Sequence, residues 1–425
     1  MNDILPEVQT EVVTKVTKTK YPLHETLLKK EWSYTTGAVL LAVFALALVI
    51  ITGKAWGVTG PFTLWGGKIL SLFGVDVVSS PIFKGIEEYS FWKDMPSMTD
   101  VGIVAGASIS VLLAAQFKLK KIKSWRNVAA AVIGGLLMGI GARLALGCNI
   151  GAFFSALPAF SLHGWVFMVA IFGGAVAGSY FLKKYFMGGA SKKPARRPAA
   201  AKQTPESRRR KRVIQMSIGI VFVAAYIVLS VYVQSINPNG AFIMLIGLAF
   251  GYVLQRSRFC FTAAFRDPKL TGSTTLTKAV ILTLMLSSLV FAALQMKSTG
   301  YALDTLNVGE LPGNIKAVGL HTALGGFIFG IGAVIAGGCA SGTLMRMGEG
   351  FMQQWIAIVF FIFGSVIGSA LLIPVQTTFL YSKEAVYLPQ MLGGWIPALI
   401  VQFGVLICLY IIADWYGRKK SGELQ

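Results

Sequence analysis

Long apolar runs separated by short polar segments dominate the pattern of side chains along the chain. Three other apolar segments, at 61–73, 148–160 and 260–265, are too short to cross a bilayer, and such segments lie at membrane depth only where protein buries them or where they line a cavity. The pattern predicts an all-α polytopic membrane protein with about ten transmembrane helices plus half-helices or re-entrant loops. Runs that can cross about 30 Å of hydrocarbon lie near 37–55, 100–117, 127–147, 163–182, 213–233, 240–255, 276–297, 320–338, 355–374 and 396–413.

A repeated motif divides the membrane region into two halves. Residues 134–151 align without a gap with residues 325–342, at an offset of 191, and ten of the eighteen positions are identical. The run at 213–233 has no counterpart in the first half, so it adds one crossing before the second repeat. We therefore expect two inverted pseudo-repeats with a site near the membrane midplane.

Basic residues predict the orientation of these halves and their boundaries. The chain carries a formal net charge of +21, and its Lys and Arg concentrate at 118–126 and 183–212, whereas 75–100 is rich in acids. Because basic loops face the cytoplasm, both termini are expected inside and the acid-rich segment outside. The expected parts are a cytoplasmic N-terminal segment (1–36), a first repeat (37–182), a basic linker that serves as a disordered tether (183–212), a second repeat with an extra leading helix (213–413) and a cytoplasmic tail (414–425).

In each half, a cysteine directly follows a glycine at the end of a long apolar run. We call this place, where the run is interrupted, the Gly-Cys break. The two cysteines are Cys148 and Cys339. Close helix packing explains the glycines, and a lone Cys is usually a small apolar residue, but packing does not require a Cys at the same place twice. We interpret both thiols as lining a midplane path, with Asn149 and Ser341 capping half-helices whose N–H groups face an anion.

The third cysteine of interest, Cys260, lies among arginines. Arg256 and Arg258 precede it, and Arg266 follows it, in a segment too short to cross the bilayer. Their guanidinium groups would attract an anion and favour the thiolate, which predicts an electropositive pocket. The alternative is that these arginines belong to a positive cytoplasmic loop.

Other ionisable residues lie in or beside the apolar runs. An arginine at membrane depth normally pairs or faces a water-filled cavity, and Arg143 and Arg346 lie close to the two breaks. His163 is either an interfacial histidine or a proton relay. The residues expected to attract an anion are Arg143, Arg258, Arg266 and Arg346.

Several classes of function find no support in the sequence. Four Cys without C-x-x-C spacing and three isolated His give no zinc or haem site, so no metal or cofactor is expected. The chain has no Ser/His/Asp set, paired acids or phosphate-binding loop, which argues against an enzyme or an ATP-driven pump. No basic stretch is interleaved with aromatic residues, so no nucleic acid partner is expected.

Motifs at 56–67, 141–149, 161–163, 260–267 and 337–339 resemble those of the YeeE/YedE family of membrane transporters, and of its YedE branch in particular. The family contains thiosulfate importers, its YedE branch is associated with selenium metabolism, and some members work with a small cytoplasmic sulfur-carrier protein. The resemblance implies that Cys148 and Cys339 form a symmetric pair that passes an anionic sulfur compound inward through S–H···S contacts. Cys260 is the third candidate thiol, and Pro61 occupies the equivalent place in the first half.

Two functions follow from these observations, and a tightly packed scaffold with no transport role is a third hypothesis. The first is uptake of thiosulfate, or a related sulfur or selenium anion, by a transporter embedded in the lipid bilayer of a bacterial-type inner membrane. The alternative is a membrane sulfurtransferase-like protein in which Cys260 becomes a persulfide and passes sulfur to a cytoplasmic carrier. A persulfide trapped on Cys260 would favour the alternative, whereas intact substrate inside the cell would favour transport.

Overall fold

Long helices make up most of the computed structural model, which describes residues 28–122, 124–186, 205–299 and 308–422. Ten helices are long and apolar enough to cross a membrane, so each predicted run is a helix and the all-α prediction is confirmed. The described ranges contain isolated β-bridges but no strand. The ten helices are α2 (Tyr34–Thr52), α4 (Met95–Leu113), α5 (Trp125–Leu144), α6 (Leu162–Phe181), α7 (Pro205–Ile236), α8 (Gly240–Ser257), α10 (Thr275–Thr299), α11 (Leu320–Ala336), α13 (Met352–Val375) and α15 (Trp395–Ser421).

Short helices occupy the segments that are too short to cross. In the first half these are α3 (Phe62–Ser71) and the π-helix η2 (Asn149–Phe154). In the second half they are α9 (Phe261–Leu270) and α12 (Ala340–Gly348). Each half therefore holds two half-helices. The remaining short helices are η1 (Pro81–Phe83), η3 (Leu182–Phe186), η4 (Val308–Glu310) and α14 (Leu388–Met391).

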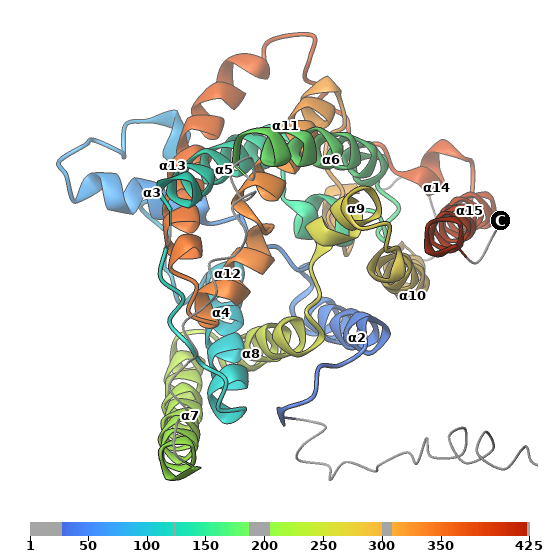
Figure 1. The fold of residues 1–425 in the computed structure, drawn as a ribbon. Coiled ribbons are helices and arrows are strands. Elements are labelled where there is room, and N and C mark those ends of the chain that lie inside the picture. The colour runs from blue at the N-terminus through green and yellow to red at the C-terminus, as the bar shows by residue number, and fades with distance from the viewer. Residues whose placement is uncertain (1–27, 123, 187–204, 300–307, 423–425) are drawn as a thin grey trace, which may run out of the picture.

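Glycines let α5 and α11 touch along their backbones, and Figure 1 shows these two helices side by side with α6. A Cβ added at Gly141 would lie 2.5 Å from the Phe329 nitrogen, and one added at Gly332 would lie 2.7 Å from the Met138 nitrogen. The two contacts are equivalent under the repeat, since 141 aligns with 332 and 138 with 329. Close packing of small residues thus accounts for the shared glycines.

The helices of the two halves also pack crosswise, so that each helix contacts the one that is not its equivalent in the repeat. The motif aligns α5 with α11 and α6 with α13; α5 packs on α13, and α6 packs on α11. Two repeats arranged around a shared axis produce such crosswise packing. The inversion of one repeat relative to the other in a membrane stays a prediction.

The additional helix, α7, lies at the edge of the bundle, where it packs on α4 and α8 (Figure 1). It begins at Pro205 and η3 runs to Phe186, so the described ends of the expected linker are helical rather than disordered. Arg and Lys are good helix formers, which lets the basic stretch extend α7. Residues 187–204 of the linker and 1–27 of the N-terminal segment lie outside the described residues.

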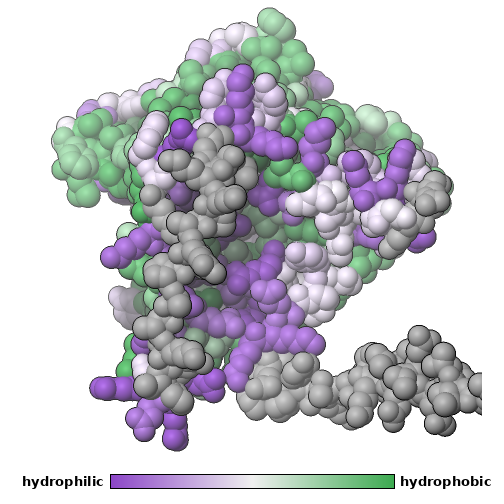
Figure 2. Space-filling model, in the orientation of Figure 1, coloured by the Kyte–Doolittle hydropathy of each residue, from purple (hydrophilic) through white to green (hydrophobic). Residues whose placement is uncertain are grey.

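Apolar and hydrophilic residues separate on the face drawn in Figure 2. Apolar residues cover its upper and left margins, whereas hydrophilic residues gather in its middle and lower part. The apolar side chains exposed on α7 include Val221 and Val228, and Ile396 and Ile400 are exposed on α15. Exposed apolar surface of this extent is expected of helices that face lipid.

Candidate functional site

Each cysteine predicted to line the path stands directly before a short helix. Cys148 precedes η2, Cys260 precedes α9 and Cys339 precedes α12. The backbone of Cys148 (φ −92°, ψ −176°) nearly matches that of Cys339 (φ −78°, ψ −175°). The first N–H groups of a helix have no partner within it, so all three thiols lie beside donors.

The two thiols of the second half lie together. The Cys260 and Cys339 side chains interact, and Cys339 Sγ lies 3.5 Å from Ser341 Oγ. A Cβ added at Gly342 would lie 3.4 Å from Cys339 Sγ and 3.6 Å from Cys260 Sγ. A larger residue at position 342 would therefore cover both sulfur atoms. The remaining cysteine, Cys408, is exposed on α15.

Asn149 connects the two breaks. It is fully buried after Cys148, and its side chain approaches the Cys339 thiol without reaching ordinary hydrogen-bond geometry. The prediction that Asn149 and Ser341 cap their helices is wrong, because neither η2 nor α12 has a side-chain cap bond. The cysteines occupy the cap positions, so both polar residues fall in the first turn beside a thiol.

Aromatic contacts join the two halves around the breaks. Phe154 of η2 meets Phe261 of α9 with ring centroids 5.1 Å apart, and Phe153 meets Phe265 at 5.2 Å. The same π-helix also contacts α12. The short helices that follow the three path cysteines thus converge on one buried region.

Unpaired polar groups lie in this region. Thr262 of α9 and Thr343 of α12 are buried, and their hydroxyl groups make no hydrogen bond with any described residue. The Trp56 Nε1 is likewise unpaired; its ring stacks on Phe250 at 3.9 Å and meets Phe154 at 5.8 Å. Buried donors are nearly always paired in folded proteins, so these groups are candidates for contacts to a ligand.

Arg143 supports the start of α3. Its Nη2 donates to the carbonyl oxygens of Thr59 and Gly60, with a distance of 2.9 Å to the second. These carbonyls lie directly before Pro61, the residue that precedes α3. The side chain therefore holds a half-helix in place from inside an apolar run, which is one of the pairings expected at membrane depth.

His163 has a counterpart in the second half. Its Nε2 lies 2.7 Å from the Ala145 carbonyl oxygen, and Gln354 Nε2 donates to the Ala336 carbonyl oxygen at 3.1 Å. Both pairs are related by the offset of 191. A glutamine does not titrate, so the shared contact favours a structural role for His163 over a proton relay.

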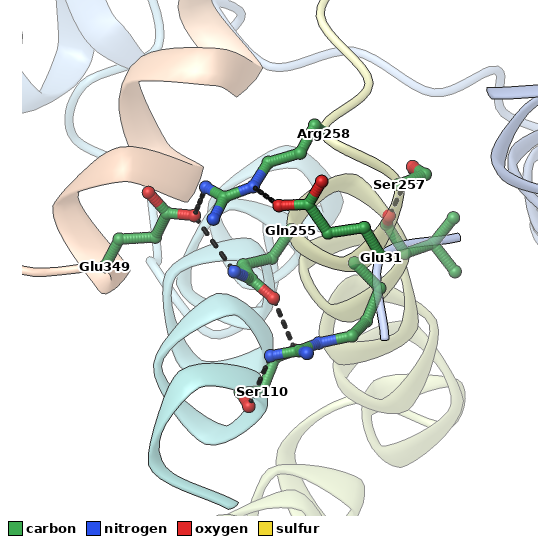
Figure 3. Close-up of polar contacts among 8 residues, drawn as sticks. Glu31, Ser110, Gln255, Ser257, Arg258 and Glu349 are labelled. Carbon is green, nitrogen blue, oxygen red and sulfur yellow. Dashed lines mark hydrogen bonds and ion pairs between the residues drawn. The ribbon is translucent and has the colours of Figure 1, made fainter. Parts of the chain in front are cut away.

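Arg258 ties two acids together at one end of the bundle (Figure 3). It ends α8 in the left-handed conformation (φ 54°), with Nη1 2.5 Å from Glu349 Oε1 and Nε 3.3 Å from Glu31 Oε1. Glu349 is buried and also accepts a hydrogen bond of 3.0 Å from Gln255, which accepts one from Ser110. This network links α4, α8 and the end of α12.

The arginines expected around Cys260 bind protein groups instead. Arg256 is buried and donates to Ser110 through Nε (2.5 Å to Oγ) and Nη2 (2.9 Å to the carbonyl oxygen). Arg266 pairs with Asp267 at 2.7 Å. The prediction of an electropositive pocket built from the flanking arginines is thus wrong, because neighbouring acceptors satisfy all three guanidinium groups.

Arg346 from α12 is the cation that acts on Cys260. The two groups interact electrostatically, and Arg346 donates to the Gly337 carbonyl. Its guanidinium lies 5.9 Å from the centre of the Phe351 ring, and Lys120 Nζ lies 3.5 Å from the same centre. Burial lowers the pKa of Lys120 from its ordinary value, while a nearby carboxylate opposes that shift. Cations therefore gather at this end of the bundle.

The burial of one acid, Asp100, was not predicted from the sequence. Asp100 was expected outside, but α4 begins at Met95 after the cap residue Asp94, so Asp100 lies in the second turn of the helix and is 1% exposed. The signal was present: an Asp two residues before Pro96 is a typical helix start.

The chain matches the family described as Sulphur transport over residues 5–177 and 256–424. The chain belongs to the Sulphur transport family. Relatives of similar length bear names of the same kind. The probable transporter YedE of Escherichia coli (strain K12) is 33% identical over 346 residues, which cover 81% of each chain. The probable transporter YedE of Salmonella typhimurium is 32% identical over 351 residues, which cover 82% of each chain.

A shorter similarity reaches a named thiosulfate transporter. TsuA of Spirochaeta thermophila is 41% identical over 123 residues, which cover 29% of this chain and 34% of that relative. Together with the ten apolar helices, membership of the Sulphur transport family makes this chain a multi-pass membrane protein for transport of sulfur compounds.

Proposed function

We propose that this protein takes up thiosulfate, or a related anionic sulfur or selenium compound, across a bacterial-type inner membrane by way of Cys148, Cys339 and Cys260. The observation that carries the proposal is the convergence of three short helices, each preceded by a cysteine, in a member of the Sulphur transport family. The partial similarity to a thiosulfate transporter supports the choice of substrate class.

The chemistry of the region suits an ion with a soft sulfur end and a hard oxygen end. Thiols offer weak S–H contacts that match a terminal sulfur, and they do so without binding water strongly. The unpaired groups of Trp56, Thr262 and Thr343 are N–H and O–H donors, which suit charged oxygens. A dry passage lined in this way replaces hydration along the ion's route.

We propose that the anion moves toward the end of the bundle that carries Lys120, Arg258 and Arg346. Positive residues favour the cytoplasmic side, so this end, both termini and the linker face the cytoplasm. There Arg346 attracts the ion, and a small sulfur-carrier protein is the proposed acceptor. A membrane-impermeant maleimide should label Ser207→Cys only after the membrane is opened; labelling of intact cells from outside would contradict the orientation.

The experiment that tests the function uses thiosulfate labelled separately at its two sulfur atoms, with purified protein in liposomes. Transport delivers both labels inside in equal amounts. In the alternative, Cys260 thiolate attacks the terminal sulfur, the S–S bond of thiosulfate breaks, a Cys260 persulfide forms and sulfite leaves. Only the terminal label would then stay with the protein. Competition by unlabelled sulfite, sulfate and selenite ranks the anions that the protein accepts.

A further inference from the structure

Asp100 is a buried acid without a partner. It lies in the second turn of α4, inside a candidate membrane span, and is 1% exposed. Neither carboxyl oxygen makes a hydrogen bond with any described residue. An unpaired carboxylate is very costly in such surroundings, so the resting side chain is the neutral acid.

Among the described residues, none of the groups that interact electrostatically with Asp100 is a cation. These groups are Cys148, Asp94 and Tyr89. Asp94 is the cap of α4 and accepts hydrogen bonds from Ser97. Among the described residues of the proposed path, Cys148 is the one that interacts with Asp100, and the cation Arg143 interacts with that same cysteine.

Glycines make close contacts between α4 and the helices packed on it. From α8, Gly247 packs against the backbone of Thr99 and Gly102, on either side of Asp100. The α12 contact, made by Gly348, lies further along at Val104, and Gly219 of α7 lies further still, beside the end of α4. The proton on Asp100 is therefore governed by what occupies the region of Cys148.

We propose that Asp100 carries a proton that is cotransported with the anion. This inference rests on the proposed function. Negative charge beside Cys148 stabilises the protonated form of Asp100. As the anion moves on toward Cys339 and Cys260, the O–H proton leaves with it on the cytoplasmic side, and a proton from outside then restores the neutral resting acid. At least one proton then accompanies each anion, which reduces the negative charge moved toward the negative side of the membrane.

The test measures two activities of the full chain in liposomes that enclose a pH-sensitive dye. One is exchange of labelled for unlabelled thiosulfate without a pH gradient, and the other is proton movement on addition of thiosulfate. In the wild type we expect both. In Asp100→Asn, which is permanently neutral and of equal size, we expect exchange within about threefold of the wild type and proton movement reduced at least tenfold. Asp100→Ser is measured in parallel in case the first variant does not fold, and Asp76→Asn, in an exposed turn, is the control that keeps both activities.

The outcomes separate this inference from the proposed function. Exchange without proton movement in the wild type overturns proton coupling and leaves thiosulfate transport standing. Unchanged proton movement in both Asp100 variants overturns the role of Asp100. Folded variants that lose exchange together with proton movement make Asp100 a part of the anion site and also overturn the proposal. Absence of exchange in the wild type contradicts the function itself.

Discussion

The two Gly-Cys breaks have nearly the same backbone conformation, but different side chains surround them. Cys148 and Cys339 have nearly the same φ and ψ, and each opens a short helix. At Cys339 a second thiol, Cys260, interacts with the sulfur, and Ser341 lies beside it. At Cys148 the groups that interact electrostatically are the acid Asp100 and the cation Arg143, and the position equivalent to Cys260 is a proline.

This difference indicates that the repeated glycines supply a common scaffold, whereas the different side chains at the two breaks make the two ends of the proposed path unlike. Both halves need the same glycines because two helix backbones meet there. The side chains around the breaks are free of that constraint, so one break can hold a thiol pair and the other a proton-carrying acid. Substitutions at equivalent positions should therefore have unequal effects.

The largest expected effect is at the thiol pair. Cys339→Ala removes a thiol that interacts with Cys260 and that we propose donates to the anion, and loss of a hydrogen bond to a charged group costs about 1.5–3 kcal/mol. That cost corresponds to roughly a ten- to hundredfold loss of thiosulfate uptake. Cys339→Ser should recover little, because a hydroxyl binds water more strongly than a thiol. Cys408→Ala is the matched control, and equal uptake by both alanine variants at equal membrane abundance would refute the asymmetry.

The fold was predictable from the sequence to a large extent, since the apolar runs and the repeated glycines have direct structural consequences. The ten helices follow from run length, and Gly141 and Gly332 meet backbone as the repeat implies. The site was less predictable. Neighbours of a thiol come from distant segments: Arg346, not the flanking arginines, acts on Cys260, and Asp100 required the correct start of α4.

The next effect concerns the shared scaffold. Gly332→Ala places a Cβ 2.7 Å from the Met138 nitrogen, and overpacking of this kind typically costs about 1–3 kcal/mol. We expect a lower melting temperature, and Gly141→Ala should match it because the contacts are equivalent. Gly404→Ala, where a Cβ meets nothing within 4 Å, should melt at or above the wild-type temperature. A large difference between the first two variants would mean that the halves are not equivalent here.

Arg143 should have a smaller effect on uptake. It has Val334 as its counterpart in the repeat, and Arg143→Gln removes contacts to the Thr59 and Gly60 carbonyls. The Gln amide can still donate to one of these carbonyls, and the bond that is lost contributes about 1 kcal/mol, so uptake should fall about fivefold. Lys84→Gln, at an exposed loop position, is the control. Equal uptake by the two variants would leave Arg143 without a role in the path.

The smallest effect is expected at His163. His163→Gln copies the Gln354 contact of the other half, so uptake should stay within about twofold of the wild type, since one neutral donor replaces another. His163→Leu leaves the buried Ala145 carbonyl without its partner and should destabilise the protein by about 1–3 kcal/mol. Loss of uptake in a stable His163→Gln protein would instead identify the ring as a proton relay.

The most direct test of the thiol path compares the wild type with the double variant Cys148→Ala, Cys339→Ala in liposomes that contain equal amounts of folded protein. Uptake of thiosulfate labelled at both sulfur atoms is measured under identical gradients. The account predicts that the wild type accumulates both labels and that the double variant stays at the level of empty liposomes. Uptake by the double variant at the wild-type rate would contradict it.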